Sequence, residues 1–197
     1  MIKIGITGGI GSGKSTVASL FELHEVPVYI ADKETKKLNN TSPHIREQLI
    51  HHFGKELYDK NNLLNKEKFA EIIFNDREKL ELANSIIHPE VLKHFNEWSL
   101  QHSENKIVAI EAAILFESNF HVHLNRVVTV YSPLNLRISR VRERDGVDEA
   151  TVRSRIKQQI SEREKIRLAD YVIINDNKSS LIDQVHNLIE DIMHRSI

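Results

Sequence analysis

Five of the chain's seven glycines lie between residues 5 and 13, close to the first residue of the sequence. Residues 8–15 read Gly-Gly-Ile-Gly-Ser-Gly-Lys-Ser and fit the pattern G-x-x-x-x-G-K-[ST]. Residues 1–6 have the composition of a buried strand, and residues 17–24 show the apolar spacing of a helix. Because glycines let backbone N–H groups curve around phosphate oxygens without a side-chain clash, this context predicts a phosphate-binding loop.

The last residues of this motif, which is the Walker A pattern, carry the polar groups. Lys14 brings a positive charge to the β- and γ-phosphates of a nucleoside triphosphate, and Ser15 offers a hydroxyl to Mg²⁺. A helix starting near Lys14 adds the positive end of its dipole. A glycine-rich turn with a chance lysine is the alternative, which the flanking strand and helix argue against. The residues expected to bind ATP here are Gly11, Ser12, Gly13, Lys14, Ser15 and Thr16.

Further apolar segments, rich in β-branched residues, alternate with helical patterns. They are expected strands at residues 26–30, 106–110, 126–131 and 170–174. Their nearly continuous hydrophobicity is typical of strands covered on both faces. The C-terminal helical pattern puts Leu181, Ile182, Val185, Leu188, Ile189 and Ile192 on one face. The alternation predicts an α/β protein of the P-loop NTPase fold, with a five-stranded parallel sheet flanked by helices.

Two helical segments interrupt this alternation, so we expect one domain with two excursions from its core. Residues 33–103 show helical periodicity without a convincing strand, and we interpret them as an acceptor-binding insert at the sheet's carboxyl edge. Residues 136–167, in which Lys and Arg outnumber Asp and Glu, form a predicted lid. The expected core is residues 1–32, 104–135 and 168–197.

Two acidic residues follow strands at the edge expected to carry the loop. Asp32 comes just after the strand at 26–30, where it could accept a proton from an attacking hydroxyl or orient that hydroxyl. It could equally be the N-cap of a helix through residues 35–38. Glu111 directly follows residues 106–110 at the end of that strand and could hold Mg²⁺ through water, or it could be an exposed strand-terminal glutamate.

Three arginines of the predicted lid recur at one helical spacing. Arg137, Arg140 and Arg144 stand at i, i+3 and i+7, so they share one stripe. Arginine makes planar, multidentate contacts with phosphate oxygens, which favours a phosphate-clamping lid. The alternative is a solvated helix face, which is the usual explanation of a charge run.

Composition excludes several classes of protein. The chain has no cysteine, so it can have neither a disulfide framework nor a thiolate metal site. Its net charge of −1 gives no bulk basic field that would favour nucleic-acid binding. No signal peptide or membrane-spanning run is visible, so we expect a soluble cytoplasmic protein with no membrane association and no obligate protein partner. The guanine-reading N-K-x-D pattern of a switch GTPase is missing, whereas a carboxylate near the loop and a cationic lid are features of a small kinase.

In combination, these and other motifs resemble the dephospho-CoA kinase family over nearly the whole chain. The matching stretches are GITGGIGSGKST at 5–16, ADKETKKL at 31–38, IIHPEV at 86–91, ILFES at 114–118, RVRERDG at 140–146, RIKQQ at 155–159 and ADYVIIND at 169–176. The loop alone is generic, but the ordered set is specific.

The resemblance implies ATP-dependent phosphorylation of the ribose 3′-hydroxyl of dephospho-CoA, the final step of coenzyme A synthesis. ATP would be the co-substrate and Mg²⁺ the metal. The residues carried over are Asp32 as the catalytic carboxylate, Lys14 and its loop for ATP, Arg140 and Arg144 in the lid, Asn175 near the adenine, and His88 and Pro89 at the acceptor. A buried structural histidine is an equal alternative for His88.

Two other functions stay open at this point. One is another small P-loop kinase that acts on a nucleoside, a nucleotide or a shikimate-like acid, because such kinases share the loop and the lid. The other is a non-catalytic protein that uses ATP as a switch. Asp32 discriminates between a kinase and a switch, since a switch needs no base beside the γ-phosphate.

Overall fold

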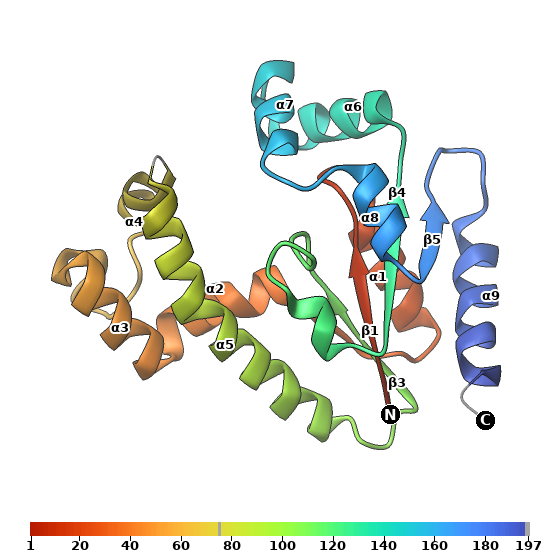
Figure 1. Cartoon of the computed structure of the whole chain (residues 1–197), viewed down its shortest axis with the longest axis horizontal. Helices are drawn as coiled ribbons and strands as arrows, with labels where there is room; N and C mark the ends of the chain where they lie inside the picture. Colours follow the sequence, from red (N-terminus) through yellow and green to blue (C-terminus); the bar gives the residue numbers. More distant parts are fainter. Residues whose placement is uncertain (75, 196–197) are drawn as a thin grey trace. The chain divides into compact units, whose positions relative to one another are not determined.

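The computed structural model describes residues 1–74 and 76–195 (Figure 1). The chain forms two compact units, one of Met1–Tyr29 with His102–Ile197 and the other of Ile30–Gln101. Within the described residues, no helix is both long enough and apolar enough to cross a lipid bilayer.

The first unit is built on a five-stranded sheet in the order β2-β3-β1-β4-β5. The strands are β1 (Ile2–Thr7), β2 (Val28–Ile30), β3 (Ile107–Glu111), β4 (Arg126–Tyr131) and β5 (Tyr171–Ile174). The pairings of β1 with β3, β1 with β4 and β4 with β5 are parallel. Residues 107–110 of β3 are buried, as are residues 127–130 of β4, which explains why their sequences are apolar at every position except Thr129. The predicted α/β fold with a parallel sheet is confirmed.

Helices follow the strands of this unit. They are α1 (Lys14–Leu23), α6 (Leu134–Asp145), α7 (Glu149–Lys157), α8 (Glu162–Leu168) and α9 (Leu181–His194), with a short 3-10 helix η2 (Phe120–His123). Helix α1 packs against β1, β3 and α9, and it buries Val17 and Phe21. Helix α9 buries Val185, Leu188, Ile189 and Ile192 of its predicted apolar face, whereas Leu181 is half-buried and Ile182 is 64% exposed. The prediction for Ile182 was therefore wrong, because this first-turn residue lies off the buried stripe.

The second unit is helical, in agreement with the helical periodicity of residues 33–103. It contains α2 (Ala31–Thr41), α3 (Pro43–Phe53), η1 (Lys55–Leu57), α4 (Lys66–Phe74) and α5 (Arg77–Gln101). Tyr58 and Leu64 add an isolated antiparallel bridge. Helix α5 packs against α2, α3 and α4, and it continues through Pro89 without a break.

The exposed side of the edge strand β5 is closed by a side chain. The backbone N–H of Ile174 donates to Gln184 Oε1 at 2.8 Å, and Gln184 Nε2 donates to the Ile174 carbonyl at 3.0 Å. The amide of Gln184, from α9, therefore occupies the place of a further strand. An edge strand otherwise leaves these backbone groups to solvent or to another chain.

We expect Gln184→Ala to destabilise the protein by about 1–2 kcal/mol, because both Ile174 groups lose their partner at the sheet edge. The measurement is urea unfolding followed by circular dichroism, with the exposed Asn187→Ala on the same helix as the control. Equal unfolding free energies for the two variants would contradict this function of Gln184.

Candidate phosphate-binding site

The glycine loop joins the end of β1 to the start of α1 (Figure 1). Gly13 is the N-cap of α1 and has φ = 93°, in the left-handed region. A β-carbon at Gly13 would also overlap Nδ2 of Asn175. Backbone conformation and available space therefore both require glycine here. Lys14, half-buried, is the first helical residue, and its Nζ lies 3.4 Å from the Gly9 carbonyl oxygen.

Asn175 holds the loop through a hydrogen bond to its backbone. It directly follows β5, and its backbone N–H donates to the Tyr131 carbonyl at 2.8 Å. Its buried side chain donates from Nδ2 to the Ser12 carbonyl, also at 2.8 Å. The side-chain Nδ2 of Asn175, a residue expected near the adenine, is thus hydrogen-bonded to the phosphate loop.

Arg140 joins the same group of contacts from α6. Its Nη1 donates to Ser132 Oγ at 3.1 Å, and its Nη2 donates to Asn175 Oδ1 at 3.1 Å and to Asn177 Oδ1. Its Nη1 also lies 3.5 Å from the Gly11 carbonyl oxygen, so acceptors from the loop and from two other segments hold the guanidinium in place. A charged, fixed donor beside a phosphate loop can contact the oxygens of a bound triphosphate.

Arg137, one turn earlier on α6, is placed differently. Its Nε donates to the Ile10 carbonyl at 2.9 Å, and Nη1 forms an ion pair with Glu162 of α8 at 3.2 Å. The side chain is only 3% exposed, and this burial lowers the pKa of the guanidinium, an effect that Glu162 opposes. It also lies so close to the Gly9 backbone that a β-carbon there would overlap it. Arg137 therefore braces the loop and has its charge neutralised by Glu162.

Arg144, the third arginine of the stripe, forms its bonds elsewhere. Its Nε donates to Asp145 Oδ1 at 2.7 Å, and Arg155 of α7 donates to the other oxygen at 2.8 Å. The hydrogen bond from Arg144 is the main reason why the pKa of Asp145 is lowered. The structure thus brings Arg137 and Arg140 to the loop, while Arg144 is bound to Asp145 near the end of α6.

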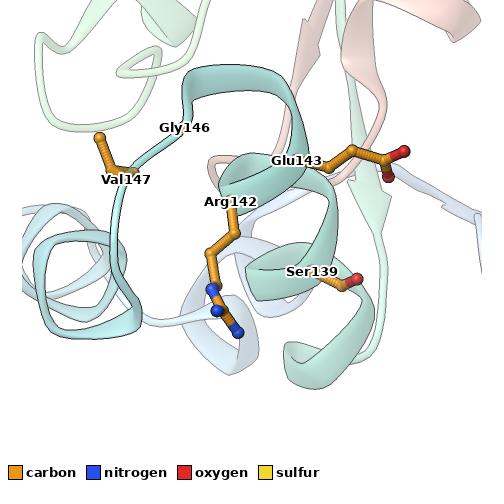
Figure 2. A pocket seen from close by; sticks show the side chains of 5 residues that line it. All are labelled: Ser139, Arg142, Glu143, Gly146 and Val147. Carbon is orange, nitrogen blue, oxygen red and sulfur yellow. The ribbon is translucent and has the colours of Figure 1, made fainter.

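A shallow surface pocket lies where α6 turns towards α7 (Figure 2). In Figure 2 its charged side chains, Arg142 and Glu143, point in different directions. The lining residues are Ser139, Arg142, Glu143, Gly146 and Val147. Because its polar groups do not converge, this pocket has less of the character of a binding site than the loop.

The oxygen donors expected for Mg²⁺ lie at the ends of two elements. Ser15 is exposed in the first turn of α1, and Glu111 is the last residue of β3, in register with Ile6 of β1. The described part of the chain contains no cluster of three or more His, Cys, Asp or Glu residues that could hold a metal. One hydroxyl and one carboxylate nevertheless fit Mg²⁺, which takes few protein ligands when phosphates and water complete its shell.

Sequence reasoning missed several polar residues around the loop. Gln159 accepts from the Ile10 N–H at 2.9 Å. Lys165 is fully buried, donates to the Ala113 carbonyl at 3.3 Å and lies 3.5 Å from Glu117 Oε1. Burial lowers the pKa of Lys165, and Glu117 opposes the shift. Gln159 and Glu117 lie within recognisable motifs, but nothing in their spacing indicates these partners.

The remaining candidates belong to the helical unit. Asp32 is exposed in the first turn of α2, whose N-cap is Ile30, so the N-cap alternative for Asp32 is wrong. The helix starts directly at the end of β2, earlier than predicted, and leaves no place for a capping residue at 32. His88 is half-buried within α5, and this burial lowers its pKa, while Pro89 is exposed.

Gly13→Ala should destabilise the protein more than Gly146→Ala. Gly146 also has a left-handed φ, of 67°, but a β-carbon there meets nothing within 4 Å. Its substitution costs only the backbone strain, about 1–2 kcal/mol. Overlap with Asn175 at Gly13 should add roughly 1–3 kcal/mol. Urea unfolding of both variants measures the difference, and equal costs would mean that Asn175 does not constrain the loop.

Comparisons with known proteins show which family the chain belongs to. A family model described as dephospho-CoA kinase matches residues 2–181. A dephospho-CoA kinase of Bacteroides fragilis is 44% identical over 188 residues, which cover 95% of this chain and 91% of that protein.

Two solved structures are similar over nearly the whole chain. A protein from Thermus thermophilus has a TM-score of 0.81 at 29% identity, covering 98% of this chain and 97% of that one. A dephospho-CoA kinase from Campylobacter jejuni has a TM-score of 0.71 at 25% identity, covering 99% and 98%. The loop, the helices around it and these matches along the whole sequence together establish that the chain belongs to the dephospho-CoA kinase family.

Proposed function

We propose that this protein transfers the γ-phosphoryl group of ATP to the ribose 3′-hydroxyl of dephospho-CoA and so completes coenzyme A synthesis. The observation that carries the proposal is the phosphate loop, with Arg140 fixed beside it, in a chain whose relatives are named for this activity. The 3′-oxygen forms a bond to the γ-phosphorus, the bond from that phosphorus to the β,γ-bridging oxygen breaks, and ADP leaves with the electron pair.

The loop and Lys14 bind the triphosphate. N–H groups of the loop and of the first turn of α1 surround the phosphates, and the ammonium of Lys14 stabilises charge on the transferred group. The transition state of phosphoryl transfer is loose, so positioning and electrostatic stabilisation supply most of the rate acceleration. The fixed backbone at Gly13 supports this function, because the loop then needs little reorganisation.

Arg140 stabilises the negative charge on the phosphoryl group while that group passes from the β,γ-bridging oxygen of ATP to the 3′-oxygen of the acceptor. Its hydrogen bonds to Ser132 and Asn175 keep the guanidinium in one place before the substrate binds. Arg144 belongs to the same proposed lid, but it reaches a phosphate only by leaving Asp145. Asn175 binds both Arg140 and the Ser12 carbonyl of the loop. In this proposal it also lies next to the adenine of the bound ATP.

The helical unit, residues 30–101, binds the acceptor. Asp32 orients the 3′-hydroxyl and takes its proton, while His88 and Pro89 shape the acceptor site. Mg²⁺, when bound by Ser15, Glu111 and the phosphates, supplies neutralisation of the phosphate charge. We place the reaction in the cytoplasm, where ATP is available.

Mass spectrometry of a mixture of the protein, ATP, Mg²⁺ and dephospho-CoA tests this function. We expect coenzyme A to form, and to form far more slowly with Lys14→Ala. Phosphorylation of a nucleoside, a nucleotide or shikimate in its place would identify another small kinase. Binding of ATP without transfer to any of these acceptors would identify a switch protein.

For Asp32→Asn we expect turnover to fall by about 100-fold, the lower part of the range for a general base, because little proton removal is needed in a loose transition state. The melting temperature should stay nearly unchanged, since Asp32 caps no helix. Glu34→Gln, at the other acid in the first turn of α2, is the control and should keep normal turnover. Normal turnover of Asp32→Asn would remove Asp32 from the mechanism.

Arg140→Ala should lower kcat for coenzyme A formation at least about 100-fold while the KM for ATP changes much less, because its charge acts on the transition state. Arg144→Ala should lower kcat less, since the structure binds that side chain to Asp145. Arg153→Ala, at an exposed arginine paired with Glu149, serves as the control. A rise in KM alone for Arg140→Ala would make Arg140 a ground-state contact.

A further inference from the structure

Ile10 forms the corner of the phosphate loop, and both of its backbone groups are bound by side chains from residues 134–168. Its N–H donates to Gln159 Oε1 at 2.9 Å, and its carbonyl accepts from Arg137 Nε at 2.9 Å. Its side chain packs with Val147 and Ile156 against the apolar cluster of Ile138, Val141 and Val152. The N–H, the carbonyl and the side chain of Ile10 therefore all contact residues of the segment 134–168.

Arg137 and Gln159 are themselves held by second partners. Arg137 forms its ion pair with Glu162, and Gln159 Nε2 donates to the Ala113 carbonyl at 3.3 Å. Ala113 follows β3, so Gln159 connects the phosphate loop to the segment after the strand that carries Glu111. Because a second protein partner already orders each of these side chains, little further conformational entropy is lost when it binds Ile10.

The segment around Ala113 is anchored by a buried ion pair. Lys165 Nζ donates to the same Ala113 carbonyl and lies 3.5 Å from Glu117 Oε1, which also accepts from the Ile160 N–H at 3.0 Å. A buried cation next to a carboxylate in this geometry resists displacement, because separating the pair would leave a charge without compensation. Gln159 thus connects Ile10 of the loop to the Ala113 carbonyl, which Lys165 holds in place.

These contacts also set where Arg140 lies relative to the loop. Arg137 and Arg140 are three residues apart on α6, so one rigid turn of helix carries the brace of Ile10 and the proposed catalytic guanidinium. If Ile10 moves with respect to α6, the phosphates and Arg140 lose their alignment. Misplacement of reacting groups by about 1 Å can cost on the order of 100-fold in rate.

We propose that Gln159 and Arg137 are positioning residues that clamp the phosphate loop at Ile10 and thereby align the triphosphate with Arg140. The clamp deepens the proposed kinase function and rests on it. Neither residue touches the reacting atoms, since the polar groups described for each are directed at Ile10 and at a second protein partner.

The test compares Gln159→Leu with Gln158→Leu, a neighbouring glutamine that is exposed. Amide hydrogen exchange of a peptide covering residues 8–13 is measured without nucleotide, and kcat and KM for ATP are measured with dephospho-CoA. In Gln159→Leu we expect the Ile10 amide to exchange at least about tenfold faster, because its acceptor is gone. We expect kcat to fall about tenfold, with a change in the KM for ATP of less than about threefold. Gln158→Leu should match the wild type in each measurement.

Two more variants separate positioning from a general loss of stability. Gln159→Glu keeps an acceptor for the Ile10 N–H and should restore most of the exchange protection. Arg137→Lys keeps a cation for Glu162 but loses the Nε donor to Ile10, so it should lower kcat with a small change in melting temperature. Wild-type exchange at Ile10 in Gln159→Leu would overturn the proposal, as would a normal kcat in that variant. Failure of the wild type to form coenzyme A would contradict the proposed kinase function, whereas the exchange result does not depend on it.

Discussion

A loop that binds phosphate through its backbone must keep its N–H groups aimed inward, although its glycines make that arrangement costly in conformational entropy. In this protein, side chains far away in the sequence supply the constraint. Asn175 binds the Ser12 carbonyl, and Arg137 and Gln159 bind the two backbone groups of Ile10. Flexible residues allow the curved path, and the three side chains select one conformation of it.

The same constraint governs the charges around the loop. Arg137 and Lys165 are buried cations, and each is balanced by a carboxylate, Glu162 or Glu117. Pairing is what makes such burial tolerable, because an uncompensated charge in the interior is strongly destabilising. Arg140 is held mainly by neutral oxygens of Ser132, Asn175 and Asn177, and none of the ion pairs found within residues 1–74 and 76–195 involves it. The arrangement separates cations that support the loop from one that can act on a phosphate.

The sequence predicted the parts of this protein that are set by local pattern. The strands, the loop and α1 follow from apolar periodicity and from the glycine motif, because adjacent residues determine them. Contacts such as Asn175 with Ser12 could not be predicted, since they depend on how β5 lies beside β4. Helical spacing put Arg144 on the stripe of Arg140, but its guanidinium is hydrogen-bonded to the adjacent Asp145, a contact that helical spacing does not predict. Asp32 looked like a possible cap only because the start of α2 was misplaced.

Calorimetric titration of Asn175→Ala with Mg²⁺ and inorganic tripolyphosphate, which has no adenine, isolates the contribution of these distant side chains to the phosphate site. If the loop is shaped by them, binding of tripolyphosphate and of ATP should weaken together, by about tenfold, since both need the conformation that Asn175 stabilises at Ser12. If only ATP binding weakens, Asn175 acts on the adenine alone. The loop would then keep its shape unaided, which contradicts the structural explanation of the site.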